Sequence, residues 1–289
     1  MQIIQWTSGK IVTWRNLLFA MVIIVSMQGC THKALPTASL AAPQAAMVGQ
    51  QPAEKIAKPS PPPPPIIEQH ALDRLKAMSE KLAAAKSFTY HSLSTVEVPA
   101  KTGQFLTLFA DAEVTLERPN KLRANITGDV PNIQFFYDGS KISVFDPQKN
   151  LFAVTDAPKT IDEMLPLVVA KFGIDFPADD FMFSDPYSLI TKNLTHAIEV
   201  GQTQVNGNPT EHFAYMNADA NLEIWIDSGP SALPRRVAVT YKTIANFPRF
   251  LLEFLDWNLI AKPSDSQFIF KKPGGAKQIE FDPSNGEMK

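Results

Sequence analysis

The chain has 289 residues, which is enough for one large or two small domains. Its 27 Lys and Arg residues against 29 Asp and Glu residues give a formal charge of −2, which argues against nucleic-acid binding through a basic surface. With 45% hydrophobic and 19% charged residues, the chain has ample material for a core. Its single cysteine excludes an intrachain disulfide framework, a zinc ribbon and an iron–sulfur cluster.

Residues 1–29 have the pattern of a secretory signal peptide. Lys10 and Arg15 are the only charges before residue 17, and nine apolar residues then run without a break from Leu17 to Val25. A transmembrane helix needs about 20 apolar residues to cross the hydrocarbon core of a bilayer. The shorter run therefore favours a signal peptide over a permanent membrane span.

The only cysteine, Cys30, comes directly after this signal. The segment SMQGC at residues 26–30 resembles a bacterial lipoprotein box, in which a small residue precedes the cysteine. The resemblance implies cleavage before Cys30, its acylation with chains such as palmitate, and attachment to a lipid bilayer through them. Thr31 follows in place of Asp, which favours the outer membrane over inner-membrane retention. The alternative is an ordinary free cysteine next to a signal sequence.

A proline-rich tether is predicted over residues 30–67. Nine of the 24 prolines lie between Ala34 and Ile66, including the run Pro61–Pro65. Proline fixes φ and lacks an N–H, so such a run favours polyproline II, a semi-rigid spacer of about 3.1 Å per residue. The segment is interpreted as a spacer that holds a domain away from a lipid surface. A ligand for a proline-recognising domain is the alternative.

The folded domain is expected over residues 68–282, with a short C-terminal tail at 283–289. It begins with a helix at 68–86, where Leu72, Leu75, Met78 and Leu82 share one face. An apolar period close to two then predicts strands at 88–98, 105–116, 122–127, 133–137, 142–145 and 151–154.

A helical insertion interrupts these strands. Thr160 and Glu163 form a capping-box pattern, and the helix that it starts ends at Gly173. Residues 178–194 are expected to be partly helical. Strands resume at 197–205, 210–216, 222–227, 235–241 and 248–259, and a last short strand is predicted at 268–270. The pairs Asp138–Gly139 and Asn206–Gly207 are hairpin signals.

Catalytic and metal-binding motifs are missing from the sequence. It contains no GxSxG, P-loop, HExxH or GxGxxG pattern. On a strand, His196 and Glu199 point to opposite faces and do not form a metal pair, and His212 is interpreted as a hydrogen-bonded structural residue. We therefore expect no catalytic residue, no metal and no cofactor.

Clustered acidic residues keep an enzymatic alternative open. Asp179, Asp180 and Asp185 lie close together in the sequence, downstream of Asp162 and Glu163. Paired carboxylates serve general acid–base chemistry or bind calcium, but a calcium loop needs a denser run of oxygen ligands. Asp179 and Asp185 equally suit helix caps and turns beside proline, which is the structural interpretation.

Apolar and aromatic residues concentrate around the helical insertion. They form either an ordinary core or the lining of a cavity between a curved sheet and a helical cover. The candidate lining residues are Phe135, Met164, Leu165, Val168, Phe172, Phe181 and Phe183.

Several short motifs together resemble a known family. They are ERPNKLR at 117–123, YDGSK at 137–141, FPADD at 176–180, DPY at 185–187, EIWI at 223–226 and LPRR at 233–236. In this combination the chain, from about residue 68 to 282, resembles a bacterial family of predicted periplasmic proteins of unknown function. That family is similar to the LolA/LolB-like lipoprotein carrier superfamily.

The resemblance implies a fold and a class of ligand. The fold is α+β and mainly β, with a strongly curved antiparallel sheet, a half-open barrel, covered by helices. In the superfamily the concave side of the sheet holds acyl chains or other hydrophobic ligands. Arg118, Lys121 and Arg123 near a strand end are candidate contacts for an anionic head group, although solvated surface charges are the simpler interpretation.

The leading hypothesis is an outer-membrane-anchored lipoprotein that faces the periplasm and is not an enzyme. Its domain would bind an acyl chain, another hydrophobic ligand or a lipoprotein, as a carrier or sensor. One alternative is an envelope interaction or scaffold module with an unknown protein partner. The other is an enzyme that uses the Asp179–Asp185 region.

Overall fold

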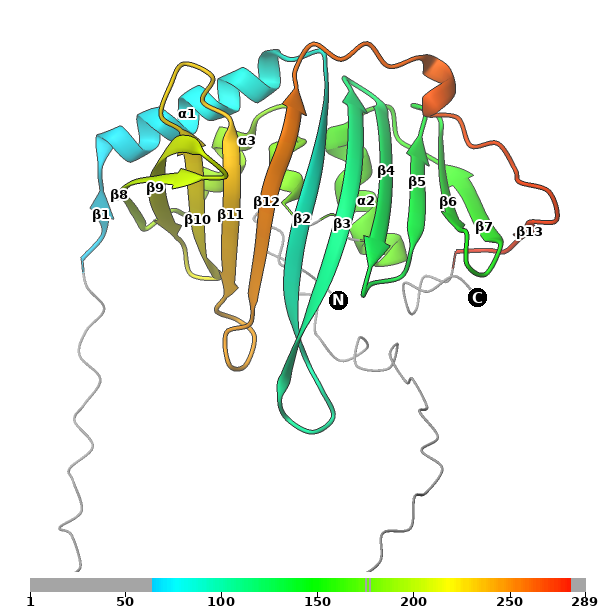
Figure 1. Cartoon of the computed structure of the whole chain (residues 1–289), viewed down its shortest axis with the longest axis horizontal. Coiled ribbons are helices and arrows are strands. Elements are labelled where there is room, and N and C mark those ends of the chain that lie inside the picture. Colours follow the sequence, from blue (N-terminus) through cyan, green and yellow to red (C-terminus); the bar gives the residue numbers. More distant parts are fainter. Residues whose placement is uncertain (1–63, 175, 177, 282–289) are drawn as a thin grey trace, which may run out of the picture. The chain divides into compact units, whose positions relative to one another are not determined.

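The computed structural model describes residues 64–174, 176 and 178–281. The predicted signal peptide, Cys30, the tail at 283–289 and almost all of the predicted tether lie outside these residues. Within them, one sheet of 13 strands carries the fold, in the order β1-β8-β9-β10-β11-β12-β2-β3-β4-β5-β6-β7-β13 (Figure 1). In the described residues no helix has both the length and the apolar character that crossing a membrane would require.

The strands follow the chain in two runs separated by a helical insertion. The strands are β1 (Ile66–Ile67), β2 (Ser87–Pro99), β3 (Phe105–Glu117), β4 (Lys121–Gly128), β5 (Ile133–Tyr137), β6 (Lys141–Asp146), β7 (Leu151–Asp156), β8 (His196–Val205), β9 (Asn208–Met216), β10 (Ala220–Asp227), β11 (Pro234–Tyr241), β12 (Arg249–Asn258) and β13 (Lys277–Gln278). Neighbouring strands are antiparallel, except for the short parallel pairs β1–β8 and β13–β7 at the two edges.

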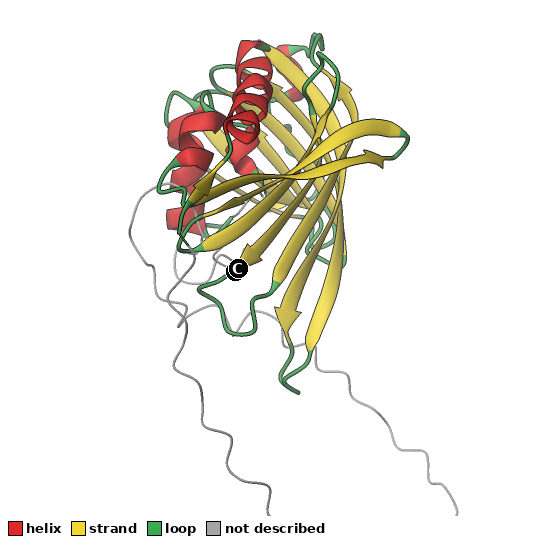
Figure 2. Cartoon of the chain, turned by 90° about the vertical axis from the view of Figure 1, so that its left-hand side faces the viewer, coloured by secondary structure: helices red, strands yellow, loops and turns green. Residues whose placement is uncertain are grey.

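Three α-helices accompany the sheet: α1 (Gln69–Ala84), α2 (Ile161–Phe172) and α3 (Pro186–Thr191). Two 3-10 turns, Asp179–Phe181 and Asp265–Gln267, complete the regular structure. Figure 2 shows the helices gathered on one face of a curved, open sheet, here called the helix-side face. The expected mainly-β architecture with a large curved sheet is confirmed.

The core lies between the helices and this face. In β2, Phe88, Tyr90 and Ser92 are buried in strict alternation, because successive strand residues point to opposite faces. The apolar face of α1 packs on the sheet through Leu75, Met78 and Leu82, each fully buried.

Hydrogen bonds between distant residues fix the helices in place. The Tyr215 hydroxyl on β9 donates to the Ala71 carbonyl of α1 at 2.9 Å. The Ser79 hydroxyl of α1 accepts the backbone N–H of Tyr187 in α3, also at 2.9 Å. Both bonds join parts of the sequence more than 100 residues apart, so α1 is held between the sheet and α3.

The predicted boundaries need two corrections. The folded part begins before residue 68, because Ile66 and Ile67 already pair with β8. The strand predicted at 268–270 is wrong: a 3-10 turn precedes it, and no strand forms there. Its aromatic side chains pack instead, since the Phe270 ring lies 5.1 Å from the Phe152 ring and 5.3 Å from the Phe136 ring.

Candidate functional site

Six of the seven predicted lining residues are buried in the main core, and the seventh, Phe172, packs at its edge. Met164, Leu165 and Val168 of α2 are fully buried. The other buried members are Phe135 on β5 and Phe181 and Phe183 in the segment between α2 and α3. Phe172 is partly exposed, and its ring lies 4.3 Å from that of Phe281.

Local sequence signals place α2 over this interior. Thr160 caps the helix by accepting a hydrogen bond from the Glu163 N–H at 3.2 Å, as the capping-box pattern predicted. Gly173 ends it with φ of 63°, a left-handed conformation that glycine adopts without steric cost. Asp162, in the first turn, accepts the N–H of Ser184 at 3.0 Å and so joins the helix start to the following loop.

The predicted head-group cations are engaged within the protein. Arg118 donates to the carbonyl oxygens of Met182 and Phe183, each at 2.9 Å, and burial lowers the pKa of its guanidinium. The Lys121 ammonium lies 2.7 Å from Glu117 and 2.6 Å from Asp265. These contacts correct both sequence interpretations, because the two side chains are neither a head-group site nor freely solvated.

The third cation of that group, Arg123, lies over an aromatic ring. Its guanidinium carbon is 3.5 Å from the centre of the Phe136 ring, and burial lowers its pKa. A cation at this distance is attracted by the ring quadrupole. Arg123 therefore completes the outer packing of β4 on β5.

Apolar side chains also continue along the helix-side face beyond the closed core. Val96 and Val98 of β2 pair with Leu108 and Leu106 of β3, so all four share the face that carries Phe88. Leu106 is 43% exposed, and the other three are intermediate in burial. We call these four residues the rim strip. They lie on the long β2–β3 hairpin, which projects past the neighbouring strands (Figure 1).

The acidic residues between α2 and α3 divide into two kinds. Asp185 caps α3 by accepting the Ser188 N–H at 3.0 Å, which lowers its pKa and confirms the structural interpretation. Burial raises the pKa of Asp180 to about 7. Tyr90 on β2 is buried, and its pKa is raised by burial and by the charge of Asp179. This region therefore holds one helix cap, Asp185, and two groups with raised pKa values, Asp180 and Tyr90.

The histidines behave largely as predicted. His212 Nε2 donates to Glu223 Oε2 at 3.1 Å, and its ring stacks on Trp225 with 3.9 Å between centroids. His196 lies on the face opposite Glu199, and its Nδ1 contacts the Thr195 hydroxyl at 3.1 Å. The hydrogen-bonded structural role of His212 is confirmed.

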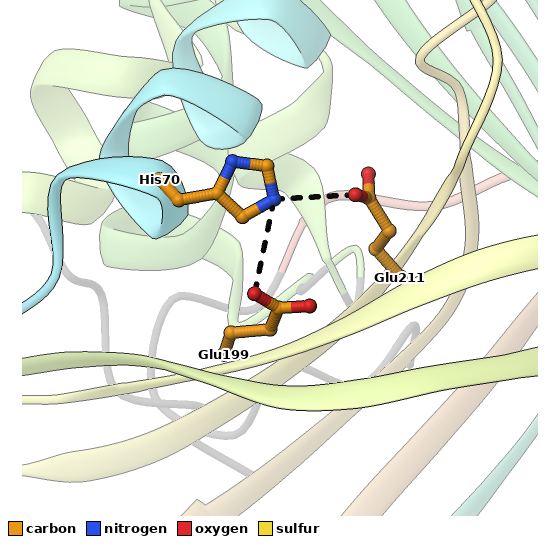
Figure 3. A group of neighbouring side chains, drawn as sticks. All are labelled: His70, Glu199 and Glu211. Carbon is orange, nitrogen blue, oxygen red and sulfur yellow. Dashed lines mark hydrogen bonds and ion pairs between the residues drawn. The ribbon is translucent and has the colours of Figure 1, made fainter.

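Glu199 instead joins a group that the sequence did not indicate. Its carboxylate lies beside His70 and Glu211, and one ligand atom from each side chain falls within 4.8 Å of the others (Figure 3). More than 120 residues separate His70 from both carboxylates in the chain, and no local motif connects them. Only the pairing of β8 with β9 beneath α1 brings them together.

A polar hollow of about 310 Å³ lies at the end of β12, near the β8–β9 turn. Four of its lining side chains, Asn206, Asn208, Arg235 and Trp257, donate hydrogen bonds within the protein. Arg235 donates a bidentate pair of hydrogen bonds to the Asp227 carboxylate, at 2.6 and 2.8 Å. The Trp257 indole N–H donates to the Pro234 carbonyl at 2.9 Å. These contacts favour a structural role for the hollow.

Comparison with known proteins relates this chain to periplasmic proteins. A family model described as "Predicted periplasmic protein (DUF2092)" matches residues 71–282. No curated protein matches the sequence.

Three solved structures of bacterial proteins are among those that resemble this chain. The lipoprotein LppX of Mycobacterium tuberculosis is 14% identical, with a TM-score of 0.42 over 67% of this chain and 97% of that chain. A LolA superfamily protein of Nitrosomonas europaea is 10% identical, with a TM-score of 0.30 over 69% and 97%. A MucA/MucB complex of Pseudomonas aeruginosa gives 17% identity and a TM-score of 0.36 over 70% and 61%.

Proposed function

Because the chain belongs to the DUF2092 family of predicted periplasmic proteins, we propose that its folded part binds an acyl chain or another hydrophobic ligand. The match confirms the family relationship that the sequence motifs indicated. The ligand would lie against the rim strip and extend toward the buried residues beneath α2. The proposed role is that of a carrier or sensor and involves no catalysis.

The rim strip is the observation that carries this proposal. Val96, Val98, Leu106 and Leu108 continue the apolar surface of the core but remain partly open to solvent. Covering exposed apolar surface is favourable by about 25 cal/mol per Å², and fully burying one leucine side chain contributes about 1.5–3 kcal/mol. An acyl chain matches such a surface because it needs no polar partner along its length.

The proposed location is the outer membrane, with the domain facing the periplasm. The lipoprotein box at residues 26–30 supports this part of the proposal, and acylated Cys30 would be the anchor. Durable attachment needs more than one acyl chain. Metabolic labelling with a palmitate analogue tests the anchor: Cys30→Ala should abolish the label and release the protein from the membrane fraction. Labelling that persists in Cys30→Ala would refute the assignment.

Two leucines of similar exposure provide a matched test of ligand binding. Leu106 is 43% exposed on the helix-side face, and Leu93 is 45% exposed on the opposite face of the same hairpin. Lipids that remain bound noncovalently during purification are extracted and identified by mass spectrometry, and a fluorescent fatty acid is titrated into the purified protein.

We expect Leu106→Lys to weaken fatty-acid binding at least tenfold and Leu93→Lys to leave it unchanged. A charged side chain at position 106 must lose its water or move away when an acyl chain binds to the rim strip. A charged side chain at position 93, on the opposite face, stays in water. Equal effects of the two substitutions, or no binding by the unmodified protein, would overturn the proposal. The scaffold alternative would be supported if the wild-type protein bound an envelope protein through the rim strip and bound no lipid.

A further inference from the structure

Three side chains, one in the first turn of α1 and one each on β8 and β9, converge on one point. His70 Nε2 lies 3.2 Å from Glu211 Oε1 and 3.9 Å from Glu199 Oε2 (Figure 3). The three ligand atoms lie within 4.8 Å of one another. The side chain of His70 is 50% exposed and that of Glu199 is 35% exposed, so solvent and ions reach the group from one side.

The sheet register explains why the two carboxylates meet. Glu199 of β8 pairs directly with Phe213 of β9, and Glu211 lies two residues before Phe213. All three therefore point to the helix-side face, where the first turn of α1 covers them. The His70 ring rests on Phe213, with 5.6 Å between the ring centroids. The hydrogen bond from Tyr215 to the Ala71 carbonyl holds this turn of α1 in place.

Negative charge exceeds positive charge around this group. Glu211 has only 11% of its side chain exposed, and its Oε2 lies 2.6 Å from Arg74 Nε. Glu199 faces the same space, and a third carboxylate, Glu68, accepts the Glu199 backbone N–H at 2.7 Å. Of these three carboxylates, Glu211 pairs with the Arg74 guanidinium, which also donates to the Asp227 carbonyl. A second cation would offset the repulsion between the two converging carboxylates.

The ligand set selects the kind of cation. Imidazole nitrogen with carboxylate oxygen is typical of Zn²⁺ and related transition metals, whereas Ca²⁺ requires six to eight oxygen ligands. Bond lengths of about 2.0–2.2 Å in a tetrahedral site place neighbouring ligand atoms about 3.3–3.5 Å apart. The His70–Glu211 distance of 3.2 Å lies just below that range and the His70–Glu199 distance of 3.9 Å lies above it. The partly exposed Glu199 side chain has room to move closer to His70.

We propose that His70, Glu199 and Glu211 bind a divalent transition metal ion of the Zn²⁺ type. Arg74 is a positioning residue, because it engages Oε2 of Glu211 and leaves Oε1 directed at His70. The three ligands leave a fourth position open to water. The ion would join α1 to β8 and β9, and so fasten the first helix of the domain to the sheet.

The test measures Zn²⁺ binding to the full chain without a polyhistidine tag, by isothermal titration calorimetry and by metal analysis after dialysis. One bound Zn²⁺ per chain is expected. His70→Gln and Glu199→Gln should each lower the affinity at least tenfold, and both sites are exposed enough for the protein to remain folded. Glu211 is left intact, since its contact with Arg74 is part of the packing.

A second histidine–carboxylate pair supplies the matched control. His91 Nε2 lies 2.9 Å from Asp111 Oδ2 on β2 and β3, with 31% of the His91 side chain exposed and no third ligand grouped with the pair in the described residues. His91→Gln should leave Zn²⁺ binding unchanged. Zn²⁺ at about 100 times the wild-type dissociation constant should raise Tm by roughly 5–10 °C in wild type and in His91→Gln, and by about half of that or less in His70→Gln and Glu199→Gln.

Two outcomes would overturn the proposal. One is that the wild-type protein binds no more Zn²⁺ than the His70→Gln and Glu199→Gln variants. The other is that His91→Gln lowers the affinity as much as they do. Neither result would affect ligand binding at the rim strip, so the two proposals fail separately.

Discussion

Arg118→Met tests whether one buried cation holds the segment between α2 and α3 on the core. The guanidinium donates to the carbonyls of Met182 and Phe183, and this contact places the buried rings of Phe181 and Phe183 under the helices. Hydrogen bonds to a charged group contribute about 1.5–3 kcal/mol each, so two give about 3–6 kcal/mol. Arg118 Nε is buried without a hydrogen-bond partner. Its removal takes away the cost of burying this polar atom, which offsets about 1–3 kcal/mol of the loss.

The net expectation is a loss of about 2–3 kcal/mol in the free energy of unfolding. Urea unfolding measures the loss, and hydrogen exchange should show faster exchange at residues 179–185. Arg249→Met is the control, since Arg249 is 43% exposed with a single ion pair to Glu223 and should cost less than about 1 kcal/mol. A loss below 1 kcal/mol for Arg118→Met would refute the reasoning.

Three further substitutions probe other parts of the domain. Thr160→Ala should cost about 1 kcal/mol in urea unfolding, because the N-cap bond to Glu163 is lost; no change would mean that the cap is redundant. Gly139→Ala should cost about 1–3 kcal/mol, because φ is +89° and the new Cβ would clash with the Asn120 side chain; an unchanged Tm would contradict this. Burial raises the pKa of Asp180 to about 7, so the folded protein holds a proton there that the unfolded chain releases near pH 4. Its contribution to stability is therefore lost as pH rises from about 4 to 7, and Asp180→Asn should gain about 2–4 kcal/mol over wild type by pH 8 but not at pH 4. Stability curves that run parallel across this range would refute the assignment.

The sequence was most informative where one residue type decides a local conformation. The predicted turn at Asp138–Gly139 forms because Gly139 adopts a positive φ and Asp138 accepts the N–H groups of Ser140 and Lys141. The Thr160 cap and the apolar alternation of β2 are of the same kind. In each case the residues that determine the local conformation are close together in the chain, so the conformation can be predicted from the sequence alone.

Contacts between distant segments could not be predicted in this way. Arg118 lies in a charged stretch that suggests exposure, yet its partners are main-chain carbonyls more than 60 residues away, which have no sequence signature. His70 gives no signal either, because its two carboxylate neighbours come from a strand pair on the far side of the helical insertion. The error at 268–270 has the opposite origin: aromatic residues favour strands, but here they pack a loop onto β5–β7.

The length of the β2–β3 hairpin determines how the rim strip can be studied. Each strand has 13 residues, but β12 pairs with β2 only as far as Val96 and β4 pairs with β3 only as far as Ala110. Beyond these points the hairpin pairs with itself alone, and an isolated two-stranded hairpin is marginally stable in water. Changes at Leu106 should therefore shift the free energy of unfolding by less than about 0.5 kcal/mol. The core of the domain then remains folded in Leu106→Lys. A loss of fatty-acid binding in this variant therefore measures the contact between Leu106 and the acyl chain.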